Sequence, residues 1–78
     1  MHISPNPNSG SFTIASDLLL QNTVISIYNS NGRLIQNNPV VNRVDMQEVS
    51  FDNLPNGVYF VRLKSDGHSI TEPFIIIK

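Results

Sequence analysis

The chain contains no cysteine and no tryptophan among its 78 residues. Without cysteine it can form neither a disulfide-stapled mini-protein nor a cysteine zinc site, and it has no thiol nucleophile. A chain of this length buries only about 60% of the surface that its unfolded form exposes. Because no disulfide can add stability, its core must be packed from aliphatic and aromatic side chains alone. The hydrophobic fraction of 40% allows one such core. We therefore expect a single domain over residues 1–78.

Charged side chains are also scarce, at 14% of the chain, with a formal net charge of −1. The basic residues are scattered along the sequence: Arg33, Arg43, Arg62, Lys64 and Lys78. A nucleic-acid backbone would meet no basic stripe, so we expect no nucleic-acid partner. No window approaches the roughly 20 apolar residues that span a bilayer, so we expect no integral membrane segment. The start MHISPNP lacks the pattern of a signal peptide, which suggests a piece of a longer chain.

Catalytic and metal-binding patterns are missing as well. His2 and His68 fall at the start and beside a turn, and neither belongs to a ligand spacing. Asp66, His68 and Ser69 are neighbours in one hairpin, where a serine–histidine–acid geometry would lack support. No loop concentrates the six to eight oxygens that calcium prefers, and no glycine-rich phosphate motif occurs. We predict that the protein is not an enzyme and takes no metal or cofactor.

The chain does contain short apolar stretches bounded by Asn, Gly, Pro, Ser and Asp. The candidate strands are residues 11–16, 23–29, 33–37, 43–51, 57–65 and 69–78. Strands of this length, separated by turns, predict an all-β protein, an antiparallel Ig-like β-sandwich of six to seven strands. The prolines at positions 5 and 7 force an extended backbone, so residues 1–10 should be an extended lead-in and residues 11–78 the sandwich.

Two glycine dipeptides predict tight turns between strands. Asn31-Gly32 tolerates the positive φ angles that a hairpin needs, and Asp66-Gly67 marks a second hairpin. Two other features predict irregular strand pairing. Residues 43–51 have no clean apolar face, and Pro73 cannot donate a ladder hydrogen bond, so each should mark a bulge or an edge position.

The stretch GVYFVRLKS is the strongest strand pattern, and its Tyr59 face should point inward. In immunoglobulin-type sandwiches a tyrosine near the start of one strand bonds its hydroxyl to the backbone a few residues upstream. Tyr59 is placed for such a tyrosine corner, although an ordinary half-buried strand tyrosine is the alternative. Phe60 points to the opposite face, where we favour burial under a neighbouring loop over an exposed contact.

The apolar run FIIIK, residues 74–78, ends the sequence. It is either the last core strand or a signal that another protein recognises. An edge strand can be both, because one face packs inward while the edge stays available for pairing with another chain. The alternation of the run suggests that Ile75 and Ile77 are buried, with Phe74, Ile76 and Lys78 on the other face.

Four pieces of the sequence, in order, carry a resemblance to a known family. They are PNP at residues 5–7 followed by Gly10, ISIYNSNGRLI at 25–35, LPNGVYFVRLKSDG at 54–67, and the apolar end at Lys78. With this order and spacing, nearly the whole chain resembles the C-terminal sorting domain of substrates of the type IX secretion system. That domain is a β-sandwich tail on many exported proteins of Bacteroidetes-type bacteria.

The resemblance implies a secretion signal. Such domains follow an N-terminal cargo domain, fold in the periplasm, and are recognised by the outer-membrane type IX secretion machinery. A sortase-like peptidase then removes the domain just upstream of it, and the cargo reaches the cell surface or the extracellular medium. By position, recognition falls on Phe74, Ile75, Ile76, Ile77 and Lys78, although family tails often end in more basic residues. The structural motif residues are Pro5, Asn6, Pro7, Gly10, Asn31, Gly32, Gly57, Tyr59, Asp66 and Gly67.

Two other functions remain open at this point. An Ig-like adhesive or carbohydrate-binding module would expose aromatic rings around Phe60. A structural spacer in a multidomain protein would be followed by further domains after Lys78. In isolation, the terminal strand also makes an edge-strand dimer plausible.

Overall fold

The computed structural model describes residues 2–4, 10–15, 23–39, 46–50, 54–65 and 67–78. The regular elements among them are all β-strands. They are β1 His2–Ser4, β2 Ser11–Ala15, β3 Val24–Asn29, β4 Leu34–Pro39, β5 Met46–Ser50, β6 Gly57–Ser65 and β7 His68–Ile76. The predicted all-β class is confirmed. Residues 2–4 of the predicted lead-in are extended and pair with β2.

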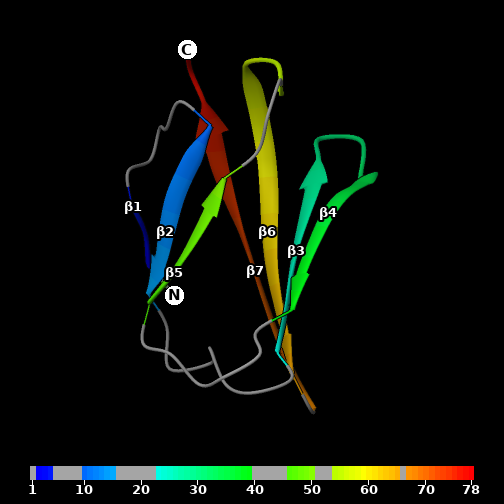
Figure 1. The fold of residues 1–78 in the computed structure, drawn as a ribbon. Helices are drawn as coiled ribbons and strands as arrows, with labels where there is room; N and C mark the ends of the chain where they lie inside the picture. Colours follow the sequence, from blue (N-terminus) through cyan, green and yellow to red (C-terminus); the bar gives the residue numbers. More distant parts are fainter. Residues whose placement is uncertain (1, 5–9, 16–22, 40–45, 51–53, 66) are drawn as a thin grey trace.

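The strands form two antiparallel sheets (Figure 1). One has the order β1-β2-β5 and the other the order β4-β3-β6-β7. In immunoglobulin nomenclature this is A-B-E against C′-C-F-G, in which C′ joins the sheet of strands C, F and G. The predicted Ig-like sandwich is therefore confirmed, and β6 takes the place of strand F, where the tyrosine corner occurs.

The core lies between the sheets and follows from the period of two along each strand. Its fully buried members come from both sheets, and the Phe12 and Phe74 rings connect β2 to β7 with centroids 4.7 Å apart. Burying one such side chain contributes roughly 1.5–3 kcal/mol. The core residues are Ile3, Phe12, Ile14, Ile25, Ile27, Val49, Tyr59, Val61, Leu63, Phe74 and Ile76.

The predicted hairpin between β3 and β4 forms around a three-residue loop. The Asn29 N–H donates to the Arg33 carbonyl, and the Gly32 N–H donates to the Asn29 carbonyl, both at 3.0 Å. The Asn29 side-chain Oδ1 also accepts from the backbone N–H groups of Asn31 and Arg33, each at 2.9 Å. Gly32 has a φ of 84°, the left-handed conformation that such a loop requires at its last position.

A bulge interrupts β4 directly after this hairpin. Ile27 lies opposite Gln36, whereas Tyr28 lies opposite Leu34, so Ile35 is the extra residue. The bulge lets Leu34 point outward beside Tyr28 while Ile35 packs against the core. The local sequence pattern did not predict this bulge.

Both stretches with irregular patterns lie on outermost strands of the described sheets. β5 pairs with β2 and buries Val49, whereas Met46, Glu48 and Ser50 are exposed. β7 pairs with β6 without any shift of register through Pro73. The edge alternative is therefore confirmed for both, because an edge strand can hold a proline whose nitrogen donates no ladder bond.

Several residues singled out by the sequence lie outside the described ranges. They are Pro5, Asn6, Pro7 and Asp66. Gly10 is described; it is buried and has a φ of 122°.

Candidate docking surface at the terminal strand

The hairpin of β6 and β7 fixes the position of the terminal strand. Ser65 lies opposite His68, so the turn between the two strands is tight, and Gly67 within it has a positive φ of 72°. The pairing then continues without a bulge to Gly57 opposite Ile76. Every residue of β7 is thereby assigned to one face of the sheet.

Tyr59 and Phe74 are directly opposite in this pairing and share the inward face. Their ring centroids lie 5.8 Å apart, and the Phe74 side chain is fully buried. Because neighbours alternate along a strand, Ile76 is buried too, whereas Ile75 and Ile77 are 40% and 56% exposed. The prediction that Ile75 and Ile77 are buried was therefore wrong.

The predicted alternation of buried and exposed residues along the run is correct, but the prediction placed the wrong set of residues on the inward face. A two-residue loop at Asp66-Gly67 places Tyr59 opposite Phe74 by counting alone, and the inward direction of Tyr59 was already predicted. Combining those two signals would have given the correct burial from the sequence. The outward side chains at this end of the chain are Ile75, Ile77 and the exposed Lys78.

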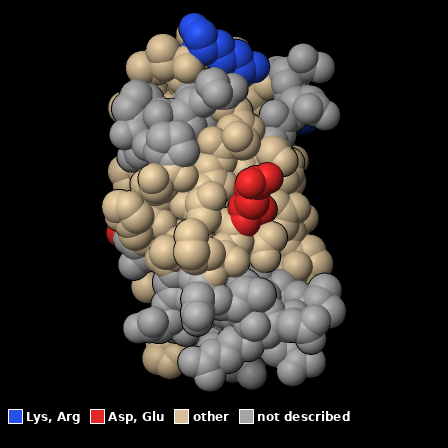
Figure 2. All heavy atoms as spheres, turned by 60° about the vertical axis from the view of Figure 1, so that its left-hand side comes forward, with Lys and Arg blue, Asp and Glu red and all other residues tan. Residues whose placement is uncertain are grey.

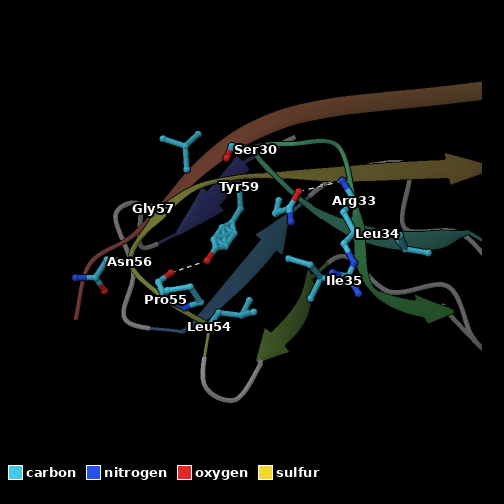
Figure 3. A pocket seen from close by; sticks show the side chains of 11 residues that line it. Ser30, Arg33, Leu34, Ile35, Leu54, Pro55, Asn56, Gly57 and Tyr59 are labelled. Atoms are coloured by element: carbon cyan, nitrogen blue, oxygen red, sulfur yellow. Dashed lines mark hydrogen bonds between the residues drawn. The ribbon is translucent and has the colours of Figure 1, made fainter.

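The loop that leads into β6 is held by Tyr59 (Figure 3). Its hydroxyl donates to the Pro55 carbonyl at 2.5 Å, four residues upstream. The ring is 5% exposed, so the hydroxyl reaches a backbone acceptor from inside the core. This is the hydrogen bond of a tyrosine corner, on the strand equivalent to F.

Asn56, in the same loop, holds the final residue of the sequence. Its side-chain Oδ1 accepts from the Lys78 backbone N–H at 3.0 Å. The bond prolongs the pairing of β6 with β7 beyond Gly57 and Ile76. Sequence reasoning missed this role, because only the neighbouring Gly57 was named as a motif residue. The signal available was an asparagine directly before a strand whose partner ends the chain.

A cavity of about 520 Å³ opens beside this corner, between the β3–β4 hairpin and residues 54–59 (Figure 3). Ile35, Leu54 and Tyr59 form part of its apolar wall. Arg33 is the only charged residue among the described residues that line it. The described lining thus combines an apolar wall with a single cation, which can contribute to binding.

The register also decides which motif residues come together. Asn29 lies opposite Tyr59, so the turn with Asn31 and Gly32 is at the same end of the sheet as Asn56 and Lys78. Gly67 lies at the other end of β6, about 26–30 Å away along the strand. The motif residues that the structure describes therefore do not form one site.

The described surface carries few charged side chains. Figure 2 shows a face on which isolated acidic and basic side chains lie among uncharged ones. Across the described parts of the chain, no group of three His, Cys, Asp or Glu residues could hold a metal ion. No helix within those same ranges is long and apolar enough to cross a membrane.

The sequence was compared with models of known protein families, and one of them matches nearly the whole chain. The model of the secretion system C-terminal sorting domain matches residues 2–78. The chain belongs to this family. It is thus a C-terminal sorting signal for type IX secretion, a class of domain and not a known enzyme. No curated protein matches the chain.

Membership of the sorting domain family has direct consequences for partners and destination. A sorting domain is part of a cargo protein and interacts with the secretion machinery. Its signal directs export to the cell surface or the extracellular space. The earlier prediction of this family from the four sequence pieces is confirmed.

Proposed function

We propose that the outward side of the terminal strand is the surface by which the outer-membrane type IX machinery recognises this sorting domain. The observation that carries the proposal is that buried and exposed side chains alternate along the end of the strand. Phe74 and Ile76 are fully buried and anchor the strand, whereas Ile75 and Ile77 expose apolar side chains. Isolated exposed apolar residues are common, but two in one short terminal stretch beside an exposed lysine form a compact recognition element.

The anchoring explains how so short an element can be presented in one conformation. The Lys78 N–H is bound by Asn56, and the Phe74 ring packs between Phe12 and Tyr59. A partner therefore binds a preorganised surface and pays less for ordering it than for a flexible tail. The domain folds in the periplasm before this step, and a sortase-like peptidase afterwards cleaves upstream of residue 1.

The test uses the full cargo chain in a bacterium with a type IX system. The double variant Ile75→Asn/Ile77→Asn changes only outward side chains and should leave the cargo in the periplasm. The matched control is Met46→Asn on β5, where a 62% exposed side chain lies on the other sheet. Cargo in the periplasm, on the surface and in the medium is measured by immunoblot, and folding by thermal unfolding of each purified variant.

Undiminished secretion of the double variant, with normal folding, would overturn the recognition proposal. A simple deletion of residues 74–78 is less informative, because it also removes two core side chains. Peptidase removal is tested separately by mass spectrometry of the mature cargo. The expected mass lacks all of residues 1–78, and a mature cargo that retains residues 2–78 contradicts this step.

A further inference from the structure

The outward face of the four-stranded sheet carries most of the exposed large apolar side chains. Among the described residues these are Leu34 at 46%, Met46 at 62%, Val58 at 45%, Ile75 at 40% and Ile77 at 56% exposure. Of the five, Met46 alone belongs to the other sheet. The remainder come from β4, β6 and the terminal strand, which are far apart in sequence.

The strand register joins these side chains into one surface. Leu34 lies opposite Tyr28, and Tyr28 lies opposite Phe60. Val58 is two residues before Phe60 on the same face. Side chains directly opposite on such a face have Cβ atoms about 4.5–5.5 Å apart, so the four are neighbours. We call Tyr28, Leu34, Val58 and Phe60 the outer patch.

A shallow hollow of about 270 Å³ borders the outer patch. Tyr28 and Leu34 form its apolar side, and Arg62 and Lys64 of β6 form the opposite side. Between them the Ser26 hydroxyl donates to Asn37 Oδ1 at 2.7 Å, so these polar groups satisfy each other. The hollow therefore combines an aromatic ring, an aliphatic side chain and two cations.

The charged side chains of this face that the structure describes have one sign. Glu48 lies opposite Thr13 on the other sheet, and Glu72 lies opposite the inward-facing Val61. Neither Arg62 nor Lys64 has an ion-pair partner among the residues that the structure describes. Two cations without a counter-charge among the described residues favour a ligand that brings its own carboxylates.

We propose that the outer patch, with Arg62 and Lys64, is a second docking surface, which binds a segment of a partner protein that carries apolar and acidic side chains. Tyr28 and Phe60 of the outer patch, together with Arg62, belong to residue types that are enriched in the buried centres of protein interfaces. The patch spans the three strands β4, β3 and β6, about 10 Å between the outermost two, which matches a short extended or helical segment. A contact surface of this small width is typical of a transient protein interface.

Other ligands fit these observations less well. Anionic membranes are bound by clusters of about four to eight Lys and Arg residues, and this face has two. A neutral sugar stacked on Phe60 would not depend on Arg62 and Lys64. A second copy of the domain would bring the same two cations and no acidic side chain of the described face.

The test places a photo-crosslinking amino acid on the outer patch of the full cargo chain in secreting cells. The substitution Val58→p-benzoylphenylalanine should yield a discrete adduct with one envelope protein. The matched control is Met46→p-benzoylphenylalanine on the other sheet, which should yield none. Adding Arg62→Glu/Lys64→Glu to the Val58 variant should lower the adduct yield at least about tenfold, because like charges then face the partner's carboxylates.

Rescue completes the test. Once the adduct partner is identified by mass spectrometry, exchange of its crosslinked carboxylates for lysine should restore the yield with the charge-reversed domain. The proposal is overturned if no adduct forms, if the adduct is a second copy or a lipid, or if charge reversal leaves the yield unchanged. Val58 lies opposite Ile75, so the two surfaces are separated with Leu34→p-benzoylphenylalanine on β4, at the other edge of the sheet. Its adduct should persist in the Ile75→Asn/Ile77→Asn background, and loss of the adduct there would contradict a separate surface.

Discussion

Asn56 and Lys78 are 22 positions apart in sequence and are joined by one hydrogen bond from the Lys78 N–H to the Asn56 side chain at 3.0 Å. The bond links the loop before β6 to the end of the terminal strand. Both partners are exposed, so the bond contributes chiefly to local order and less to global stability.

Replacing Asn56 by alanine should therefore loosen the last residues without unfolding the sandwich. The variant Asn56→Ala loses the acceptor, and we expect faster exchange of the Lys78 amide proton by NMR. The free energy of unfolding should fall by about 1 kcal/mol or less. Asn56→Asp keeps an acceptor oxygen and is the control. Equal exchange rates in both variants would contradict the role of this bond.

The tyrosine corner predicts a larger effect on stability. Tyr59→Phe keeps the ring that packs on Phe74 but leaves the Pro55 carbonyl without its donor. We expect a loss of about 0.5–1.5 kcal/mol in urea unfolding. Tyr28→Phe is the matched control on the outward face, where the structure shows no hydroxyl bond within the described ranges. A stability loss no larger than that of the control would refute the corner's contribution.

Adjacent isoleucines of the terminal run should differ sharply in their contribution to stability. Ile76→Ala creates a cavity in the core and should destabilise the domain by about 2–5 kcal/mol. Ile77→Ala removes the same atoms from a 56% exposed position and should change stability by about 0.5 kcal/mol or less. Chemical denaturation of the two variants side by side measures the difference, and similar losses would show that the assigned faces are wrong.

The β3–β4 hairpin offers a test of backbone conformation. An added Cβ at Gly32 would meet no atom within 4 Å, so substitution there is opposed by the φ of 84° alone. Gly32→Ala should lower the free energy of unfolding by about 1–2 kcal/mol. Gly32→Asn should lose less, because asparagine enters the left-handed region more readily. The three melting temperatures should therefore fall in the order unsubstituted protein, Gly32→Asn, Gly32→Ala.

Much of the fold was accessible from the sequence because it depends on local signals. Glycine turns and short alternating apolar stretches predicted the strands, and the hydrophobic pattern of GVYFVRLKS predicted the inward face of Tyr59. The edge positions of β5 and β7 followed from a mixed pattern and from Pro73, since both features are tolerated where one side of a strand lacks a partner.

The candidate site was predicted less completely. The terminal strand was identified correctly, but the burial of its isoleucines was assigned to the wrong face. Burial depends on register, and a shift of one residue exchanges the two faces of a strand. The bulge at Ile35 and the bond from Lys78 to Asn56 depend on pairing between separate strands, which no local pattern contains.

By itself, the sequence determined the class of the fold, its glycine turns, the family and the terminal run as a strand. These follow from backbone preferences and from the period of two, which act over a few residues. Only the tertiary structure decided that Phe74 and Ile76 are buried as anchors, and that Ile75 and Ile77 are exposed. The physical reason is that Phe74 must meet Tyr59 across the hairpin and Phe12 across the core, and both contacts exist only when the two sheets are packed.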